Sequence, residues 1–281
     1  MRNIFTRINN LFKALRHRYT MPLRLELSIV DHCNLNCKGC THYCPIAPEH
    51  FMPLSQLRDN LTHLSAVDKL MFKSIYILGG EPLLHPDISE VCRLTRRLFP
   101  STEIKILTNG IKVSTMDPEF WQACHDTDTT ISVTVYPVKV DYGEINRLCE
   151  AHGVQYEIFH EEKDGYFFSK HTIDDRNPTN RYINFIRCYQ VGCLTLRDDR
   201  IFPCATSAYA DFINKRFNRD FKHMTPAGRC RNGDYVDVKS VKSHRDLTAL
   251  YHKPTPFCRY CTKLEPMQWG HSHSSESEWL P

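Results

Sequence analysis

Strand-like and helix-like segments alternate along residues 23–160, and this alternation constrains the fold more than any other feature of the chain. Apolar runs rich in Ile, Val, Leu and Tyr predict five strands, at 23–30, 74–80, 103–110, 130–137 and 154–159. Proline, serine and aspartate mark the starts of helices between them, at 53–69, 86–98, from 117 onward, and 141–152. Strand–helix units in series predict a parallel sheet joined by right-handed crossovers.

The length of this region decides between a closed and an open sheet. A complete eight-unit barrel needs about 250 residues, whereas about 150 are available here. We therefore expect an α/β fold with an open or partial barrel. After about residue 180 the pattern changes: residues 193–204 predict a β-hairpin, which a helical stretch near 205–220 and a polar stretch near 225–245 follow.

Cysteine is unusually frequent, with 13 residues in a chain of 281. The sequence shows neither a secretory signal nor a run of 18 apolar residues, so we expect a cytoplasmic protein without a membrane span. Disulfides are rare in that compartment, and clustered thiols there usually hold metal. The net charge of +4 is too small to indicate a nucleic-acid partner.

The first cysteine group lies directly after the first predicted strand, in the segment VDHCNLNCKGCTHYCP at residues 30–45. Three residues separate Cys33 from Cys37, two separate Cys37 from Cys40, and Cys44 follows. A structural zinc site usually takes two separate Cys-x2-Cys pairs, which differs from this spacing on one loop. Three thiolates can instead hold three irons of a 4Fe–4S cluster, and the fourth iron then stays open for a ligand.

The segment CNLNCKGC resembles the Cys-x3-Cys-x2-Cys signature of the radical S-adenosylmethionine (AdoMet) superfamily, and GGEPLLHPDI at 79–88 resembles its Gly-Gly-Glu-Pro motif. The resemblance implies that Cys33, Cys37 and Cys40 bind a 4Fe–4S cluster whose open iron takes AdoMet. Glu81 is expected to meet the amine of AdoMet. The residues that the resemblance assigns to AdoMet binding are Tyr43, Gly79, Gly80, Glu81, Pro82, Asn109, Ser132 and Thr134. Most lie at the ends of predicted strands, where parallel α/β folds build their sites.

Two positions depart from the pattern of the superfamily. Gly39 stands where an aromatic residue often lies beside the adenine, and Tyr43 or His42 is a candidate replacement. Cys44 is an additional thiol, interpreted either as buried packing or as a reactive group that faces the site. Candidates for substrate contacts are His42, His85, Tyr136, His160 and Tyr166.

The second group consists of Cys188, Cys193, Cys204, Cys258 and Cys261. It resembles the twitch extension of some members of the superfamily, a shorter form of the SPASM domain, in which four cysteines hold an auxiliary 4Fe–4S cluster. Asp199 stands where that pattern usually has glycine. Cys188 and Cys193 compete for one position, and a structural zinc site is the alternative interpretation.

These resemblances predict a partial (β/α)6 TIM-like radical AdoMet barrel with a small twitch/SPASM-like domain. The expected parts are a basic amphipathic helix at 1–20, the core at 21–180, the auxiliary domain at 181–265, and a polar, partly disordered tail at 266–281. The N-terminal helix either packs on the protein or contacts an anionic membrane surface.

The implied chemistry is reductive cleavage of AdoMet to a 5′-deoxyadenosyl radical, which removes hydrogen from a substrate C–H bond. An external one-electron reductant such as flavodoxin or ferredoxin is then required. One core and one auxiliary cluster in a chain of this length resemble the aminocyclitol dehydrogenases, which implies oxidation of a sugar or cyclitol alcohol. The alternatives are epimerisation with Cys44 or Cys193 as hydrogen donor, and modification of a peptide. The Gly-Gly-Glu-Pro motif disfavours a non-catalytic zinc module.

Overall fold

A computed structural model describes residues 22–159, 167–170, 172–224 and 233–281, so the predicted N-terminal helix, His160 and Tyr166 lie outside the described residues. The main sheet has the strand order β5-β4-β3-β2-β1-β7-β8-β9. Its parallel part consists of β1 (Arg24–Val30), β2 (Ser74–Gly79), β3 (Glu103–Thr108), β4 (Thr129–Thr134), β5 (Tyr156–Phe159) and β7 (Leu194–Arg197). These six strands confirm the predicted partial α/β barrel.

The remaining strands complete the edges of the molecule. β8 (Arg200–Phe202) pairs antiparallel with β7, which confirms the predicted hairpin, and β9 (Val236–Asp237) pairs antiparallel with β8. β6 (Phe167–Lys170) pairs with β10 (Glu265–Gln268) in a separate two-stranded sheet. This small sheet joins the segment after β5 to the C-terminal part of the chain.

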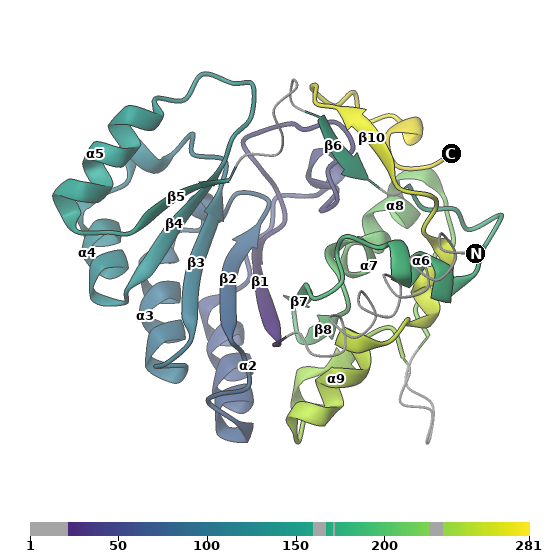
Figure 1. Cartoon of the computed structure of the whole chain (residues 1–281), viewed down its shortest axis with the longest axis horizontal. Helices are drawn as coiled ribbons and strands as arrows, with labels where there is room; N and C mark the ends of the chain where they lie inside the picture. Colours follow the sequence, from purple (N-terminus) through teal and green to yellow (C-terminus); the bar gives the residue numbers. More distant parts are fainter. Residues whose placement is uncertain (1–21, 160–166, 171, 225–232) are drawn as a thin grey trace, which may run out of the picture.

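Helices flank the parallel strands on one side (Figure 1). They are α2 (Leu54–Val67), α3 (Ile88–Leu98), α4 (Pro118–Asp126) and α5 (Tyr142–His152). Local capping explains their ends: Asp117 accepts a hydrogen bond from the Phe120 amide at the start of α4, and Gly153 ends α5 in a left-handed conformation, with φ of 64°. Cys92, Cys124 and Cys149 lie buried on these helices, as predicted.

The C-terminal helices are α6 (Arg181–Arg187), α7 (Ala205–Ala208), α8 (Ala210–Phe217) and α9 (His244–His252). The first three lie across the strands from α2–α5 (Figure 1), whereas α9 contributes Leu247, Leu250 and Tyr251 to the same apolar core as α2–α5. Short 3-10 turns occur at Cys44–Ile46, Pro82–Leu84, Val113–Thr115, Val238–Ser240, Pro256–Tyr260 and Glu276–Glu278. The helical stretch predicted near 205–220 is thus two helices, which Tyr209 separates. None of the helices in the described part of the chain is long and apolar enough for a membrane span.

The register of the parallel strands gives the sheet two different faces. Leu27, Ile77 and Ile106 are aligned across β1, β2 and β3, and all three belong to the large apolar core under the helices. Because side chains alternate along a strand, the neighbouring row points to the opposite face. That row is polar: Glu26 is aligned with Tyr76, and Tyr76 with Lys105.

Residues 266–281 differ from the expected polar, partly disordered tail. Trp279 and Leu280 are buried in a second apolar cluster with Tyr43, Tyr209 and other side chains of the C-terminal region. The Ser-rich composition hides this packing, because only two large apolar side chains at the end of the segment supply it. The tail is therefore a structural part of the protein, and it lies next to the first cysteine loop.

Candidate functional site

The loop after β1 brings together Cys33, Cys37 and Cys40, here called the first thiol group. Each of the three is partly exposed, so a ligand can approach them. The pKa values of the Cys33 and Cys37 thiols are raised to about 12, mainly by burial. The charge of Cys40 contributes to both rises, and that of Glu81 contributes to the rise at Cys33. The three sulfurs thus lie near enough to repel one another when ionised. A cationic iron–sulfur centre would relieve that repulsion, and this donor set fits one.

Hydrogen-bond donors surround these sulfurs. The Leu35 amide donates to Cys33 Sγ over 3.3 Å, and Asn109 Nδ2 lies 3.6 Å from the same sulfur. The indole Nε1 of Trp269 donates to Cys37 Sγ over 3.3 Å. N–H groups directed at sulfur stabilise ionised thiolates, which are the form that ligates metal.

Cys44 lies behind this group and is buried. A hydrogen bond from its thiol, together with one from His42, holds the pKa of Cys40 well below its usual value, while the pKa of Cys44 itself is raised. A buried thiol that donates to a neighbouring cysteine fits the packing interpretation of Cys44 better than a role in facing substrate.

The glycine pair after β2 allows the cysteine loop to approach closely. The Gly80 amide donates to the Val30 carbonyl over 2.6 Å, and the Glu81 amide donates to the His32 carbonyl over 3.1 Å. A Cβ atom on Gly80 would lie 1.8 Å from the oxygen of His32. Glycine is therefore required here by packing, since its backbone angles are ordinary.

Glu81 makes hydrogen bonds within the protein in addition to its predicted contact with AdoMet, which stays a prediction. Its side chain is 0% exposed and accepts hydrogen bonds from the Leu83 amide (3.0 Å), the Thr108 hydroxyl (2.8 Å) and the Asn109 amide (3.0 Å). Burial raises its pKa, although these bonds act in the opposite direction. Because its partners cover the carboxylate, it cannot meet an amine without rearrangement. It also joins the ends of β2 and β3 and holds Asn109 beside Cys33.

The other predicted AdoMet contacts divide into two sets. Asn109 lies at the first thiol group, where its Nδ2 also donates to Asn34 Oδ1 over 2.8 Å. Ser132 and Thr134 are on β4, the first buried and the second partly exposed. Tyr43, by contrast, is 3% exposed and packs edge-on against Trp279, so the predicted aromatic surface at Tyr43 is covered. Pro82 is buried in the turn after Glu81.

Three of the candidate substrate contacts can be placed. His85 is buried and bonds through Nε2 to the Met52 carbonyl and through Nδ1 to the Asp87 amide, which indicates a structural role. His42 hydrogen-bonds to Cys40. Tyr136 follows β4, and its ring centroid lies 6.3 Å from that of Trp269. Tyr136 therefore remains beside the first thiol group.

Four cysteines of the C-terminal region form a second thiol group, which consists of Cys188, Cys204, Cys258 and Cys261. Burial raises the pKa of Cys204 well above its usual value, and the charges of the other three raise it further. Burial acts in the same way on Cys261, with Cys258 and Cys188 as its charged neighbours. These effects place the four sulfurs together, at the end of α6, the start of α7 and the turn at 256–260.

Cys193 lies near Cys204, but its strongest charged neighbour is outside this arrangement. After burial, Glu26 is the main cause of its raised pKa, both by charge and by hydrogen bonding. The structure thus favours Cys188 over Cys193 as the fourth member of the second thiol group. Within the described residues, no three His, Cys, Asp or Glu side chains gather as ligands of one metal ion would. A zinc site needs four donors about 2.3 Å from one ion, whereas a four-iron cluster separates its thiolates more widely.

The polar face of the sheet was not singled out by sequence reasoning. Glu26 is 7% exposed, and the Thr195 hydroxyl donates to it over 3.3 Å. The Arg24 guanidinium lies over the Tyr76 ring at 4.6 Å, and Lys105 Nζ bonds to Glu157 over 2.9 Å. A polar residue in a central parallel strand, such as Glu26 in LRLELSIV, is the signal that could have revealed it, because such strands are usually apolar throughout.

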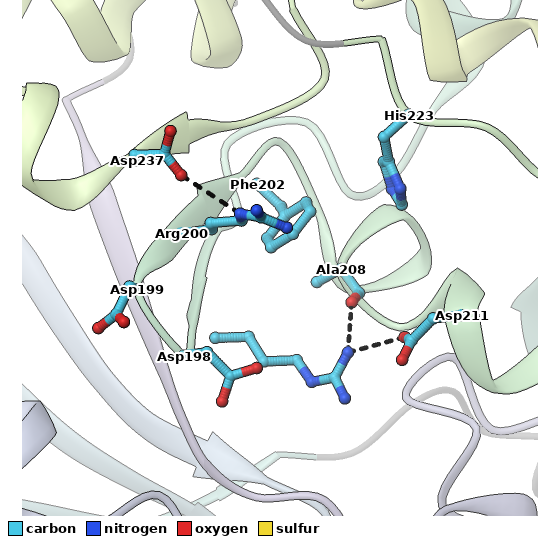
Figure 2. A pocket seen from close by; sticks show the side chains of 9 residues that line it. Asp198, Asp199, Arg200, Phe202, Ala208, Asp211, His223 and Asp237 are labelled. Atoms are coloured by element: carbon cyan, nitrogen blue, oxygen red, sulfur yellow. Dashed lines mark hydrogen bonds and ion pairs between the residues drawn. The ribbon is translucent and has the colours of Figure 1, made fainter.

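A hollow of about 470 Å³ lies beside the β7–β8 hairpin, away from the cysteines (Figure 2). Its arginines already have partners: Arg197 donates to the Ala208 carbonyl over 2.7 Å and to Asp211 over 2.8 Å, and Arg200 pairs with Asp237 over 3.2 Å. None of the cysteines lines this hollow. It is therefore not the site at which the predicted chemistry would occur.

Comparisons with known proteins agree with this geometry. Residues 27–153 match the model of the Radical SAM superfamily. Molybdenum cofactor biosynthesis protein 1 of Bos taurus is 30% identical over 124 residues, which are 42% of this chain and 19% of that protein. GTP 3',8-cyclase 2 of Mycobacterium bovis is 40% identical over 91 residues, 31% of this chain and 24% of that protein. The matches thus span a quarter or less of the length of these curated relatives.

A solved structure shares the fold over most of the chain. The crystal structure of BtrN in complex with AdoMet and 2-DOIA is 17% identical, with a TM-score of 0.53, and covers 87% of this chain and 94% of that one. The superfamily is characterised by a 4Fe–4S cluster and AdoMet, for which the first thiol group is suited. Residues 27–153 of this chain are thus similar to the Radical SAM superfamily, and the chain shares the partial barrel fold of BtrN.

Proposed function

We propose that this protein oxidises an alcohol carbon of a sugar- or cyclitol-like substrate, after cleavage of AdoMet at the first thiol group. The second thiol group is the observation that carries the proposal, because four neighbouring sulfurs suit a second 4Fe–4S cluster. When bound, the first cluster supplies the electron that cleaves AdoMet, and the second supplies an acceptor for the electron that the substrate radical must lose.

The polar face of the sheet supports a hydroxylated substrate. Glu26, Tyr76 and Lys105 are aligned on it, on the opposite face from the apolar layer. Oxidation of an alcohol transfers the C–H hydrogen atom to the 5′-deoxyadenosyl radical, one electron to an acceptor, and the O–H proton to a base. Glu26 is a carboxylate that accepts from the Thr195 hydroxyl and interacts with the Cys193 thiol, and its remaining lone pairs give it acceptor capacity for that proton.

The shared fold with BtrN adds further support. That structure holds AdoMet together with 2-DOIA, and the similarity extends over the C-terminal half of this chain as well as the barrel, at 87% coverage. A comparable small substrate would fit a chain of the same architecture. The reaction would also need a one-electron donor, for which a flavodoxin or ferredoxin is proposed.

Redox-neutral epimerisation is the second candidate, and Cys193 is the observation that favours it. Its thiol is buried next to Glu26 on the polar face, and burial keeps it protonated by raising its pKa. An S–H bond at this place could return a hydrogen atom to a substrate radical. Cyclisation of GTP is a further activity to test, because one of the similar proteins is named GTP 3',8-cyclase 2.

The experiment uses protein reconstituted anaerobically with iron and sulfide. It should contain about eight irons per chain, and about four in a Cys258→Ala variant. Sugars, aminocyclitols and GTP are then incubated with AdoMet and reduced flavodoxin, and products are analysed by mass spectrometry. A product two mass units lighter than its alcohol, formed by wild type and lost in Cys258→Ala, would support the proposal.

Other outcomes would exclude it. Incorporation of solvent deuterium without a change of oxidation state, abolished by Cys193→Ala, would establish epimerisation. Conversion of GTP alone among the compounds would assign the protein to cyclase chemistry. Four irons in wild type, with no loss in Cys258→Ala, would refute the auxiliary cluster.

A further inference from the structure

The C-terminal strap, residues 265–280, lies across the loop that carries the first thiol group. The Lys38 amide donates to the Gly270 carbonyl over 2.8 Å, and the Ser272 amide donates to the Asn36 carbonyl over 2.9 Å. The Asn36 side chain returns a hydrogen bond to the Ser272 carbonyl, also over 2.9 Å. At the start of the strap, β10 pairs with β6 (Figure 1). Segments more than 230 residues apart are thus bonded on both sides of Cys37.

A buried carboxylate fixes the far end of the strap. Glu278 is 2% exposed and accepts hydrogen bonds from the Ser272 hydroxyl (2.6 Å), the His273 amide (2.8 Å) and the Gly39 amide (3.4 Å). Next to it, Trp279 Nε1 donates to the Cys40 carbonyl over 2.9 Å. The strap is therefore attached to the cysteine loop next to Cys37 and again next to Cys40.

Gly39 shows that the loop is shaped for this contact. Its φ is +63°, and a Cβ atom there would lie 2.6 Å from both Lys170 Nζ and Met267 Cε. The backbone conformation and the lack of space both favour glycine. A larger residue at this position would push aside the side-chain ends of Lys170 and Met267.

Trp269 lies just before Gly270 in the strap and donates a hydrogen bond to the sulfur of Cys37, a predicted cluster ligand. Its Nε1 lies 3.3 Å from Cys37 Sγ, and its ring packs at 5.0 Å from that of His271. An indole N–H is a donor only, so the proton lies between nitrogen and sulfur. Hydrogen bonds to ligand sulfurs are one of the determinants of iron–sulfur potentials, because they stabilise the more negative, reduced state.

We propose that Trp269 is a positioning residue of the C-terminal strap that raises the reduction potential of the cluster at Cys33, Cys37 and Cys40. It does so by donating its indole hydrogen bond to Cys37. The strap thereby makes electron delivery to the cluster easier. This inference rests on the proposed cluster at the first thiol group, but not on the substrate or on the second thiol group.

The test compares Trp269→Phe with Trp121→Phe in the reconstituted protein. Phenylalanine keeps most of the ring but lacks the N–H, whereas Trp121 is buried against His152 and belongs to α4, which carries no member of the first thiol group. The reduction potential is measured by titration of the electron paramagnetic resonance signal that changes when AdoMet is added. At a fixed potential, Trp269→Phe should lower the ratio of reduced to oxidised cluster about tenfold, which is about 59 mV for one electron. Trp121→Phe should leave the ratio unchanged.

A second measurement keeps the proposal testable if Trp269→Phe does not bind iron. Wild-type protein with ¹⁵N in its tryptophan indoles should show a ¹⁵N hyperfine coupling to the reduced cluster, and Trp121→Phe should retain it. An unchanged potential in loaded Trp269→Phe, or no ¹⁵N coupling in wild type, would overturn the inference. Absence of a cluster from wild type would instead refute the proposed function, so the two failures are distinguishable.

Discussion

Replacement of Gly80 by alanine should disrupt the first thiol group without any change to a cysteine. The added Cβ would lie 1.8 Å from the His32 oxygen, 2.3 Å from the His32 carbonyl carbon and 3.0 Å from the Cys33 nitrogen. Non-bonded heavy atoms rest about 3.5 Å apart, so the two segments must separate by roughly 1.5 Å. These atoms belong to backbone, which cannot rotate away as a flexible side chain could.

This displacement sets the expected magnitudes. Overpacking of this kind costs about 1–3 kcal/mol in the free energy of unfolding. A shift of about 1 Å in a reacting group can reduce turnover about 100-fold, so AdoMet cleavage should fall by at least that factor. Gly143→Ala is the matched control, because its Cβ would meet only Asp141 Oδ1 at 3.3 Å, and alanine is favoured over glycine in a helix such as α5.

Urea unfolding of the metal-free proteins measures the stability, and the release of 5′-deoxyadenosine by the reconstituted proteins measures the activity. Gly80→Ala should be impaired in both assays, and Gly143→Ala in neither. If Gly80→Ala bound iron and cleaved AdoMet at the wild-type rate, the close contact between the two loops would not be what positions Cys33.

Three further predictions follow from the buried groups. Arg197→Met should lower the unfolding free energy by about 3 kcal/mol, because it leaves the buried Asp31 without the arginine that lies 3.2 Å away. Arg200 forms an exposed ion pair, so Arg200→Met should lower the unfolding free energy by under about 1 kcal/mol. Equal losses in the two variants would contradict this prediction. Burial alone would raise the pKa of Glu278, but the hydrogen bonds from Ser272 and nearby amides lower it below the ordinary value of 4.5. Ionised Glu278 therefore stabilises the folded protein at pH values above 4.5, and this stabilisation is lost as the pH falls through the pKa of the folded state. The stability difference between wild type and Glu278→Gln, measured by urea unfolding of metal-free protein, should therefore shrink below pH 4.5, and a constant difference would contradict it. Cys44→Ala should retain iron binding and AdoMet cleavage, with a loss of about 1–3 kcal/mol in unfolding free energy. If this variant lost only substrate turnover, Cys44 would be a hydrogen donor and the packing interpretation would be wrong.

The sequence was sufficient for the barrel and for the first thiol group because both depend on local patterns. Apolar runs fix the strands, and the loop after β1 carries Cys33, Cys37 and Cys40 within eight residues. The Gly79-Gly80 pair likewise lies next to the strand end that it serves. Its steric reason, the approach of Gly80 to His32, could be seen only in three dimensions.

The strap was missed because its contacts join distant parts of the chain. Neither Trp269 nor Glu278 belongs to a periodic pattern, and the segment between them is rich in serine and histidine, a composition typical of exposed tails. One local signal was available: Ser275 and Glu278 have the Ser-x-x-Glu spacing of a capping box, which the structure contains. That signal predicts a helical turn, but not what the turn packs against.

The hydrogen bonds of Glu81 within the protein were beyond the sequence for a related reason. A carboxylate in a glycine-rich motif suggests a ligand contact, but the choice between a ligand and protein partners depends on burial. Thr108 and the Asn109 amide, both on the next strand end, occupy its oxygens. The competition between Cys188 and Cys193 was also beyond the sequence, since Glu26 on β1 lies far from both along the chain.

The most direct test of the account is AdoMet cleavage by anaerobically reconstituted protein under reducing conditions. The account predicts an iron–sulfur chromophore and release of 5′-deoxyadenosine and methionine. It also predicts that Cys37→Ala abolishes both products while Cys92→Ala, at a buried helix thiol, retains them. Tight binding of zinc with no iron–sulfur chromophore, or undiminished 5′-deoxyadenosine from Cys37→Ala, would contradict the assignment of Cys33, Cys37 and Cys40 as the cluster ligands.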